Sequence, residues 1–397
     1  MKKYSTRNLF KKLHLWLGLP SGIVIFIVAI TGCIYAFQDE IKDMMRPSLK
    51  VESNGKAFLS PEELKEKAGR YVFVTPADSS NAIFGVMYAT YDKAATVACS
   101  MQPNGYTVLY LNPYNGELLH KEAFKNDFFR VMLAGHRSLW LPHPIGKQIV
   151  GWSVLVFVVV LISGIALWIP AKMNKKALKA GLKIKWKAPF SRVNYDLHNV
   201  LGFYTALVAL LIALTGLTWS FSWFAKGYYG VITGGKEFRK WEPAQSDTTL
   251  VSGRTDASTI LWEQMLKEYP VGNRGTFRFD FPQKPQDAFT VCFNPHEHSY
   301  YAREFRFFDQ HTLKELKAGG TYGIKLAEAS AGDKLYRMNY DIHTGSILGL
   351  PGRIIVFLAS LIIASLPVTG FIIWWRKKKK DANCMIVRIK VLLLLIT

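Results

Sequence analysis

Four long runs of uncharged, mostly apolar residues divide the chain: residues 16–37, 149–169, 200–224 and 354–375. Each run is at least as long as the roughly 20 residues that an α-helix needs to cross a hydrocarbon core about 30 Å thick. The buried helices of a soluble protein would rarely need four uncharged runs of this length. The pattern therefore predicts a membrane α-helical protein with four spanning helices.

The first and third runs are copies of each other, and a histidine opens each copy. His14 stands before the first run and His198 before the third. A Thr-Gly pair follows each histidine after 17 residues (31 − 14 and 215 − 198), at residues 31–32 and 215–216. A repeat of this kind indicates duplication of a structural unit.

The second and fourth runs match in the same way, and they follow His136 and His343. From Gly146 and Gly352 onward the two segments keep a constant offset of 206 residues (352 − 146). The same offset relates the pairs Ser163-Gly164 and Thr369-Gly370. The chain is therefore predicted to be a four-helix bundle made of two duplicated helix hairpins.

The charge of the chain lies mostly beside the apolar runs. The formal net charge is +21, and basic residues cluster before the first run, between the second and third, and after the fourth. Short basic segments stay in the cytoplasm, so both termini and the central loop are predicted to be cytoplasmic. Lysines next to spans fix topology and contact anionic lipid, which makes nucleic-acid binding a weak interpretation of the charge. These residues are Lys2, Lys3, Arg7, Lys11, Lys12, Lys172, Lys175, Lys176, Lys179, Lys183, Lys185, Lys187, Arg192 and Arg376 to Lys380.

The predicted organisation alternates cytoplasmic, spanning and outer segments. Two long segments, residues 38–148 and 225–352, lie outside the membrane, which in a bacterium means the periplasm. The remaining segments are the cytoplasmic N-terminus 1–15, the spans 16–37, 149–170, 199–224 and 353–375, the basic loop 171–198 with a short amphipathic helix over 177–186, and the basic tail 376–397.

The first span has an alternative interpretation as a cleaved signal. Ile30-Thr31-Gly32-Cys33 resembles a lipoprotein signal, because a basic start and an apolar core end in a small residue and a cysteine. The repeat places Thr215-Gly216 at the matching position of the third span, followed by leucine. We therefore expect a retained helix, and a lipidated, truncated product is the alternative.

Both outer segments show mixed helix and strand patterns. Ser60 followed by Pro61 predicts the start of a helix that ends near residue 70, and residues 256–269 are its counterpart. Alternating runs at 82–91, 106–111, 277–281 and 288–293 predict strands, and turn-rich stretches at 110–118 and 307–316 predict hairpins. Each segment is large enough for a small α+β domain. Cys99 and Cys292 could pair in an oxidising compartment, but the sequence does not show that they are close.

The chain resembles the PepSY-associated transmembrane proteins, a family of iron-regulated bacterial inner-membrane proteins that includes siderophore reductases. The residues that carry the resemblance are the Leu-His-Leu-Trp-Leu-Gly start at 13–18, Asp196-Leu197-His198, Asp341-Ile342-His343 and the hairpin Asn112-Pro113-Tyr114-Asn115-Gly116. The resemblance covers about residues 8–380 and implies that each helix hairpin carries an inserted PepSY-like domain. The second hairpin departs from the pattern at Leu313-Lys314, which implies a looser second domain.

The four histidines predict two haem sites. Both copies start inside and have the same orientation, so a pseudo-two-fold axis along the membrane normal would pair His14 with His198 near the inner face, and His136 with His343 near the outer face. Two imidazoles facing each other across such an axis can ligate one haem iron from opposite sides. A structural role is the simpler interpretation of any single histidine, but polar residues at duplicated positions in a membrane usually mark function.

Two arginines and several other histidines complete the list of candidates. Arg130 and Arg337 precede His136 and His343 by six residues each (136 − 130 and 343 − 337), and they could pair with haem propionates. Turn capping or a surface salt bridge is the alternative. His143 could replace His136, although the repeat does not support it. His296 and His298 have metal-like spacing, but we expect a solvated loop.

The expected function is electron transfer by two b-type haems. Bis-histidine iron has no open coordination site and suits electron transfer. The resemblance implies a periplasmic ferric siderophore or other ferric chelate as acceptor, since reduction to ferrous iron weakens hard oxygen ligation. Nucleotide-binding fingerprints are absent, so the donor would be a quinol or a flavoprotein.

Two alternative functions remain: a non-redox PepSY-type interaction protein that regulates peptidases, and a small-molecule permease. The spans lack the charged residues that a proton-coupled permease needs.

Overall fold

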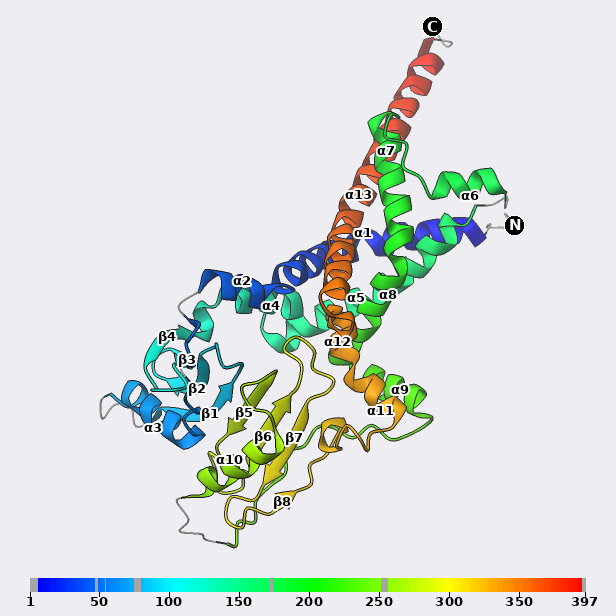
Figure 1. Cartoon of the computed structure of the whole chain (residues 1–397). Helices are drawn as coiled ribbons and strands as arrows, with labels where there is room; N and C mark the ends of the chain where they lie inside the picture. Colours follow the sequence, from blue (N-terminus) through cyan, green and yellow to red (C-terminus); the bar gives the residue numbers. More distant parts are fainter. Residues whose placement is uncertain are drawn as a thin grey trace. The chain divides into compact units, whose positions relative to one another are not determined.

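The computed structural model describes residues 6–46, 49–53, 55–74, 80–170, 174–250 and 256–394 (Figure 1). The chain divides into two compact units, which we call the helical unit and the sheet unit. The helical unit comprises Met1–Ala36, Met132–Phe221 and Pro351–Thr397. The sheet unit comprises Phe37–Val131 and Ser222–Leu350. Lys2, Lys3 and Lys172 of the basic clusters lie outside the described residues.

The described residues contain four helices that are long and apolar enough to cross a membrane, as the sequence predicts. They are Thr6–Tyr35, His143–Trp168, Phe190–Ser220 and Ser346–Lys380. The first two are α1 and α5. The third joins α7 (Phe190–Asp196), a π-helical turn η4 (Leu197–Leu201) and α8 (Gly202–Ser220). The fourth lies mostly in α13 (Gly349–Leu394), the longest helix in Figure 1.

All four long helices contribute to one small core. Ile25 of α1, Leu161 of α5, Ala209 of α8 and Ile363 of α13 form a buried cluster. Apolar side chains on the outer surface of the four helices are exposed, and Leu207, for example, is 68% exposed. A soluble bundle would cover a surface of this kind, whereas a lipid-facing bundle leaves it in contact with acyl chains.

The sheet unit contains one antiparallel sheet of eight strands in the order β4-β3-β2-β1-β5-β6-β7-β8. The first outer segment supplies one half of the sheet and the second segment the other, and β1 pairs with β5 at the join. The two segments therefore share one sheet, where the sequence predicts two separate domains. The strands are β1 Ala82–Tyr88, β2 Ala95–Met101, β3 Gly105–Leu111, β4 Leu118–Ala123, β5 Thr276–Asp280, β6 Phe289–Asn294, β7 Glu304–Phe308 and β8 Glu315–Leu316.

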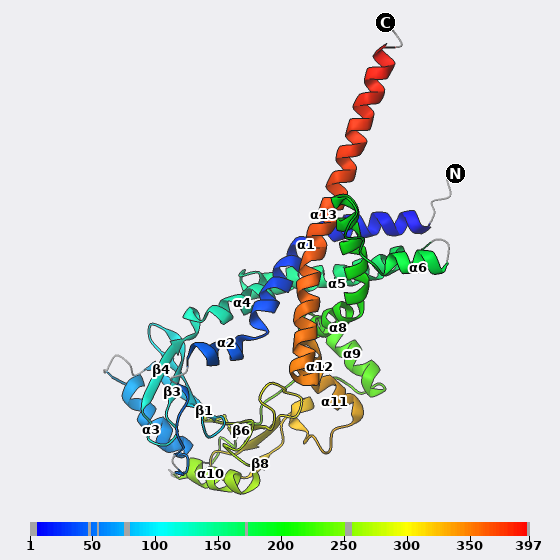
Figure 2. The same ribbon diagram turned by 45° about the horizontal axis from the view of Figure 1, so that its top comes forward.

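Two helices cover one face of this sheet, α3 (Pro61–Val72) and α10 (Ala257–Glu268) (Figure 2). Ser60 caps α3, since its hydroxyl accepts from Glu63 N and the Glu63 carboxylate accepts from Ser60 N in return, a capping box. Leu64 and Leu261 are fully buried against the sheet. Both helices and the four strands expected from the sequence are confirmed within a few residues.

Shorter helices complete the fold. Within the sheet unit or at its boundary they are α2 Gln38–Met45, η3 Phe124–Asn126, α4 Phe128–Ser138, α9 Ser222–Thr233, η5 Thr321–Gly323, α11 Ala331–Arg337, α12 Asn339–Thr344 and η6 Ser346–Leu348. The helical unit adds α6 (Lys175–Gly181), which is shorter than the helix predicted over 177–186. The third span ends at Ser220, where Phe221 adopts an extended conformation, and not at residue 224.

The two buried cysteines of the sheet unit are free thiols. Cys99 lies on β2 and Cys292 on β6, and strands β1 and β5 separate them. Three strand spacings of about 4.8 Å are too far for a disulfide bond. The pairing that the sequence leaves open does not form.

Candidate functional site

His14 of α1 is held by the backbone of α5. Its Nδ1 lies 3.1 Å from the carbonyl oxygen of Val160 and 3.0 Å from the hydroxyl of Ser163. The Ser163 hydroxyl donates to the same carbonyl at 2.8 Å, so it is an acceptor toward the imidazole. Because a carbonyl only accepts, Nδ1 carries the proton, and Nε2 keeps its lone pair in the neutral ring.

His198 of η4 is held by α13 in the same manner. Its Nδ1 lies 3.1 Å from the carbonyl oxygen of Leu366 and 3.0 Å from the hydroxyl of Thr369. These partners are offset by 206 residues from Val160 and Ser163 (366 − 160 and 369 − 163). Both histidines therefore make the same contacts in the two halves. His198 also sits in a π-helical turn, a distortion that occurs frequently at functional sites.

A glycine makes room for each ring. A Cβ atom on Gly164 would lie 3.1 Å from Cε1 of His14, and a Cβ atom on Gly370 would lie 3.1 Å from Cε1 of His198. Each glycine stands four residues after the carbonyl that accepts from the ring (164 − 160 and 370 − 366). The imidazole lies across one helical turn, and a side chain at the glycine position would push it away.

The two rings lie close together within the helical unit. Their centroids are 6.1 Å apart and their planes are nearly perpendicular, at 88°. Two metal–imidazole bonds of about 2 Å each, made from opposite sides of one ion, also put ring centroids roughly 6 Å apart. The described residues contain no group of three or more His, Cys, Asp or Glu side chains that could hold a metal.

His136 of α4 makes a third contact of the same type, against α1. Its Nδ1 lies 2.8 Å from the carbonyl oxygen of Val28, and a Cβ atom on Gly32 would lie 3.0 Å from the ring. Gly32 again follows the accepting carbonyl by four residues (32 − 28). Burial lowers the pKa of His136, which favours the neutral form of the ring that a metal ligand needs.

His343 lies in α12 and belongs to the sheet unit, whereas His136 belongs to the helical unit. The aspartate two residues before His343 fixes its helix. Asp341 is fully buried and accepts from Tyr300 N at 2.8 Å and from Tyr301 N at 2.7 Å. The equivalent residue before His198, Asp196, is buried and forms an ion pair with Arg192 at 2.8 Å. Asp341 therefore anchors α12, which carries His343, to the segment at Tyr300, whereas the Asp196 ion pair lies within α7, directly before the π-helical turn of His198.

The two candidate arginines lie in unlike surroundings. Arg337 is 1% exposed and donates to the carbonyl oxygens of Thr321 and Ile324. Its Nη1 atom has no hydrogen-bond partner among the described residues, and burial lowers the pKa of Arg337. Arg130 is exposed and stacks on the Phe124 ring, 4.0 Å from its centroid. The matched spacing in sequence does not give the two arginines matched environments.

The remaining histidines stand apart from these contacts. His143 is exposed at the first residue of α5. His298 lies 3.8 Å from Asp39, a loose contact, and His296 lies against the ring of Tyr301. His120 packs against the ring of Tyr110 in the sheet.

The sequence analysis missed the partners of the histidines. Ser163 and Thr369 were noted only as part of the repeat, although their hydroxyls contact the rings. The signal was present, because a small polar residue followed by glycine recurs in all four apolar runs, at 31–32, 163–164, 215–216 and 369–370.

Comparison with known protein families matches nearly the whole chain. The family described as the PepSY-associated TM region matches residues 11–377. The chain belongs to the PepSY-associated transmembrane family. No curated protein matches this PepSY-associated chain. The matched range covers the second and third long helices, most of the first and fourth, and the whole sheet unit, so the repeated histidine contacts lie within the PepSY-associated region.

Proposed function

We propose that this protein is a haem-dependent ferric reductase of a bacterial inner membrane. It would bind two b-type haems and pass electrons across the membrane to a periplasmic ferric siderophore or other ferric chelate. The observation that carries the proposal is the pair His14 and His198. Their ring centroids lie 6.1 Å apart, and each ring has its Nδ1 committed to a backbone carbonyl.

The contacts of this pair match what haem ligation requires. A ligating histidine usually donates its other ring N–H to a carbonyl or carboxylate, which fixes the tautomer and the ring orientation. Val160 and Leu366 supply that carbonyl. Gly164 and Gly370 leave space for the rings. His14 and His198 would then supply the axial ligands of the inner haem.

The outer haem would be held by His136 and His343. His136 already shows the carbonyl contact and the glycine, and the sequence repeat assigns the corresponding role to His343. Arg337 would hold a propionate through its uncommitted Nη1 atom. Arg130 would also hold a propionate, from its exposed position on the surface. Bis-histidine haem supplies one-electron transfer without an open site for oxygen.

The proposed topology follows the duplication and the charges. Two copies of a helix hairpin, each with an inserted PepSY-like segment, would surround the haems. Basic residues of the described chain, such as Arg7, Lys175 and Arg376, support a topology in which both termini and the central loop would be cytoplasmic. The sheet unit would lie in the periplasm, where it meets the chelate.

The test is reduction of a chelate by the isolated protein. The protein is purified in detergent after expression with ample haem, reduced with dithionite, freed of excess reductant and mixed with a ferric trihydroxamate siderophore. We expect the reduced α-band to disappear while ferrous iron appears in a ferrozine trap, with one iron reduced per haem oxidised. A haem-loaded protein whose α-band persists would contradict the reductase assignment.

A further inference from the structure

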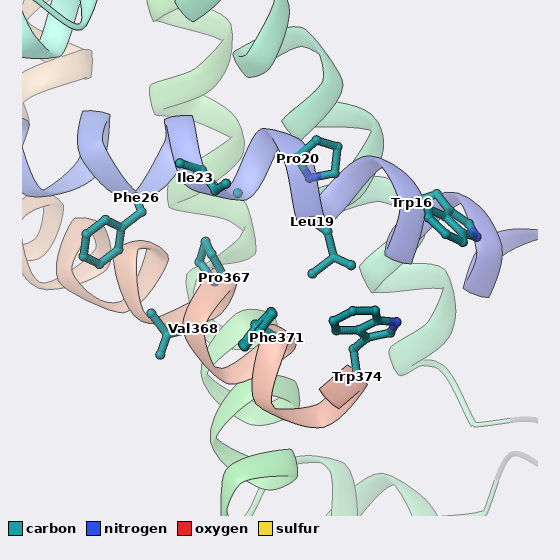
Figure 3. A pocket seen from close by; sticks show the side chains of 10 residues that line it. Trp16, Leu19, Pro20, Ile23, Phe26, Pro367, Val368, Phe371 and Trp374 are labelled. Carbon is teal, nitrogen blue, oxygen red and sulfur yellow. The ribbon is translucent and has the colours of Figure 1, made fainter. Parts of the chain in front are cut away.

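An apolar groove of about 790 Å³ lies between α1 and α13 within the helical unit (Figure 3). Trp16, Leu19 and Pro20 form one wall, and Pro367, Phe371 and Trp374 form the other. In Figure 3 the Leu19 side chain points toward Trp374 and Phe371. The volume falls in the range of about 300–1,000 Å³ that small-molecule sites occupy.

The matching contact in the other half of the repeat is closed. There Trp168 of α5 stacks on Phe203 of α8, with centroids 3.7 Å apart and planes at 9°. Trp374 is the copy of Trp168 (374 − 206), but the copy of Phe203 (203 − 184) is Leu19. The tryptophan is kept while its aromatic partner is replaced, so the groove occupies the place of the missing ring.

Two prolines also distinguish the groove from its copy. Pro20 and Pro367 line the groove, and the repeat places Tyr204 and Leu161 at the equivalent positions. A proline has no N–H, so the carbonyl of Trp16 receives no hydrogen bond from Pro20. A carbonyl at membrane depth needs a partner. The groove wall is formed by aromatic and aliphatic side chains, and the Trp16 carbonyl next to Pro20 lacks its usual i+4 donor.

The groove is also close in sequence to the inner histidine pair on both of its helices. Trp16 follows His14 by two residues, and Phe371 directly follows Gly370, the glycine that packs on His198. Trp374 lies at the basic end of α13, where Lys378 Nζ is 5.3 Å from its ring centroid. Trp16 is 69% exposed, so a ligand arriving from lipid meets it first.

We propose that this groove binds a membrane quinol, which is the electron donor of the protein. The inference rests on the proposed electron-carrier function. A quinol has a flat ring for the indole walls, a hydroxyl that can donate to the Trp16 carbonyl, and an isoprenoid tail that stays in lipid. A phospholipid acyl chain would use neither the aromatic stacking nor this carbonyl. Oxidation of one quinol to quinone releases two electrons to two one-electron ferric acceptors, and two protons to water at the basic end.

Binding is tested without haem, by quenching of tryptophan fluorescence with ubiquinone-1 in detergent. The wild type is expected to show a saturable component from Trp16 and Trp374. Leu19→Phe restores the residue of the closed copy and should weaken this component at least tenfold. Phe203→Leu makes the reciprocal change in the closed copy, which opens the stack on Trp168, and it should not weaken the component from Trp16 and Trp374. Circular dichroism and gel filtration check that both variants fold like the wild type.

A second readout uses the haem-loaded protein. Decylubiquinol should reduce the wild type and the Phe203→Leu variant, and Leu19→Phe should slow this reduction at least tenfold while dithionite reduces all three equally. Quenching that never saturates, or that phosphatidylglycerol vesicles abolish in every variant equally, would overturn the quinol site in favour of ordinary lipid. Failure of the proposed function would instead appear as absence of haem, with the fluorescence result unaffected.

Discussion

The two halves of the chain agree closely at the histidines and differ at the arginines, the hairpin turns and the outer helix contacts. His14 and His198 contact a carbonyl, a hydroxyl and a glycine at equivalent positions, with distances that agree within 0.1 Å. The arginines before the other two histidines, the hairpin turns and the outer helix contacts have all diverged. The difference shows which part of the duplicated unit is constrained: the geometry of a neutral imidazole held against a helix backbone.

The arginines give the largest expected difference between the halves. Arg337→Met removes a buried guanidinium and leaves the carbonyls of Thr321 and Ile324 without donors, which should cost about 3 kcal/mol of local stability. Arg130→Met removes an exposed side chain and should change stability by less than about 0.5 kcal/mol. Hydrogen exchange of the amides around η5 is measured in both variants and compared with the wild type. Equal protection in the two variants would mean that the buried contacts of Arg337 do not hold this loop.

The glycines beside the rings test whether the matched geometry matters. Gly164→Ala and Gly370→Ala each place a Cβ atom 3.1 Å from an imidazole, so the ring must move by a few tenths of an ångström. We expect about tenfold weaker haem retention, at the lower end of the range for groups that orient a ligand. Gly18→Ala is the control, because its Cβ atom meets only Val160 at 3.7 Å. Retention is measured by transfer of haem to apomyoglobin, and equal rates in all three variants would show that the rings do not bind haem.

The hairpin turns should respond to substitution in opposite directions. Gly116 has φ +74° in the first hairpin, and Leu313 takes the equivalent place in the second with φ +57°. Both amides donate to the carbonyl at the start of the turn, Asn112 or Asp309. Gly116→Leu should destabilise the sheet unit by about 1–2 kcal/mol because a left-handed leucine is strained. Leu313→Gly should be neutral or stabilising by up to about 1 kcal/mol, and thermal unfolding in detergent compares them. Destabilisation by both would mean that packing of Leu313 outweighs its backbone strain.

The same turns should differ in acid sensitivity, the smallest effect. Burial opposes ionisation of Asp309, but N–H donors from Thr312, Asp247 and His311 lower its pKa from 3.8 to about 2. A depressed pKa stabilises the fold fully above pH 3.8, and this contribution is lost as the pH falls toward 2. Asp309→Asn should therefore flatten the stability profile of the second hairpin between pH 4 and 2. Asn112→Asp would introduce the same acid dependence into the first hairpin if its turn donates equally. Unchanged profiles in acid titrations monitored by tryptophan fluorescence would contradict this account.

The sequence predicts the parts of this structure that depend on periodic patterns. Uncharged runs identify all four long helices, because each residue in a span meets the same constraint. The Ser60 cap and the alternating strands are readable for similar local reasons. The π-helical turn at His198 cannot be predicted from the sequence, since residues 197–201 contain no helix-breaking residue.

Contacts between distant residues were harder to predict. The single eight-stranded sheet depends on pairing between β1 and β5, which lie almost 190 residues apart and carry no signal for each other. The hydroxyls of Ser163 and Thr369 were visible in the repeat, but nothing local shows that they meet a histidine. The groove can be recognised only from the structure, which shows Trp168 stacked on Phe203. The repeat then identifies Leu19 as the residue that stands in place of this phenylalanine in the other half.

The central claim is that imidazole pairs at two levels of this membrane protein each ligate a haem. A pyridine haemochrome count on the detergent-purified protein, made beside His14→Ala and His136→Ala variants, tests it most directly. The account predicts two b-type haems per chain in the wild type and about one in each variant, with low-spin spectra throughout. A wild-type protein that is folded and carries no haem after expression with excess haem would contradict it.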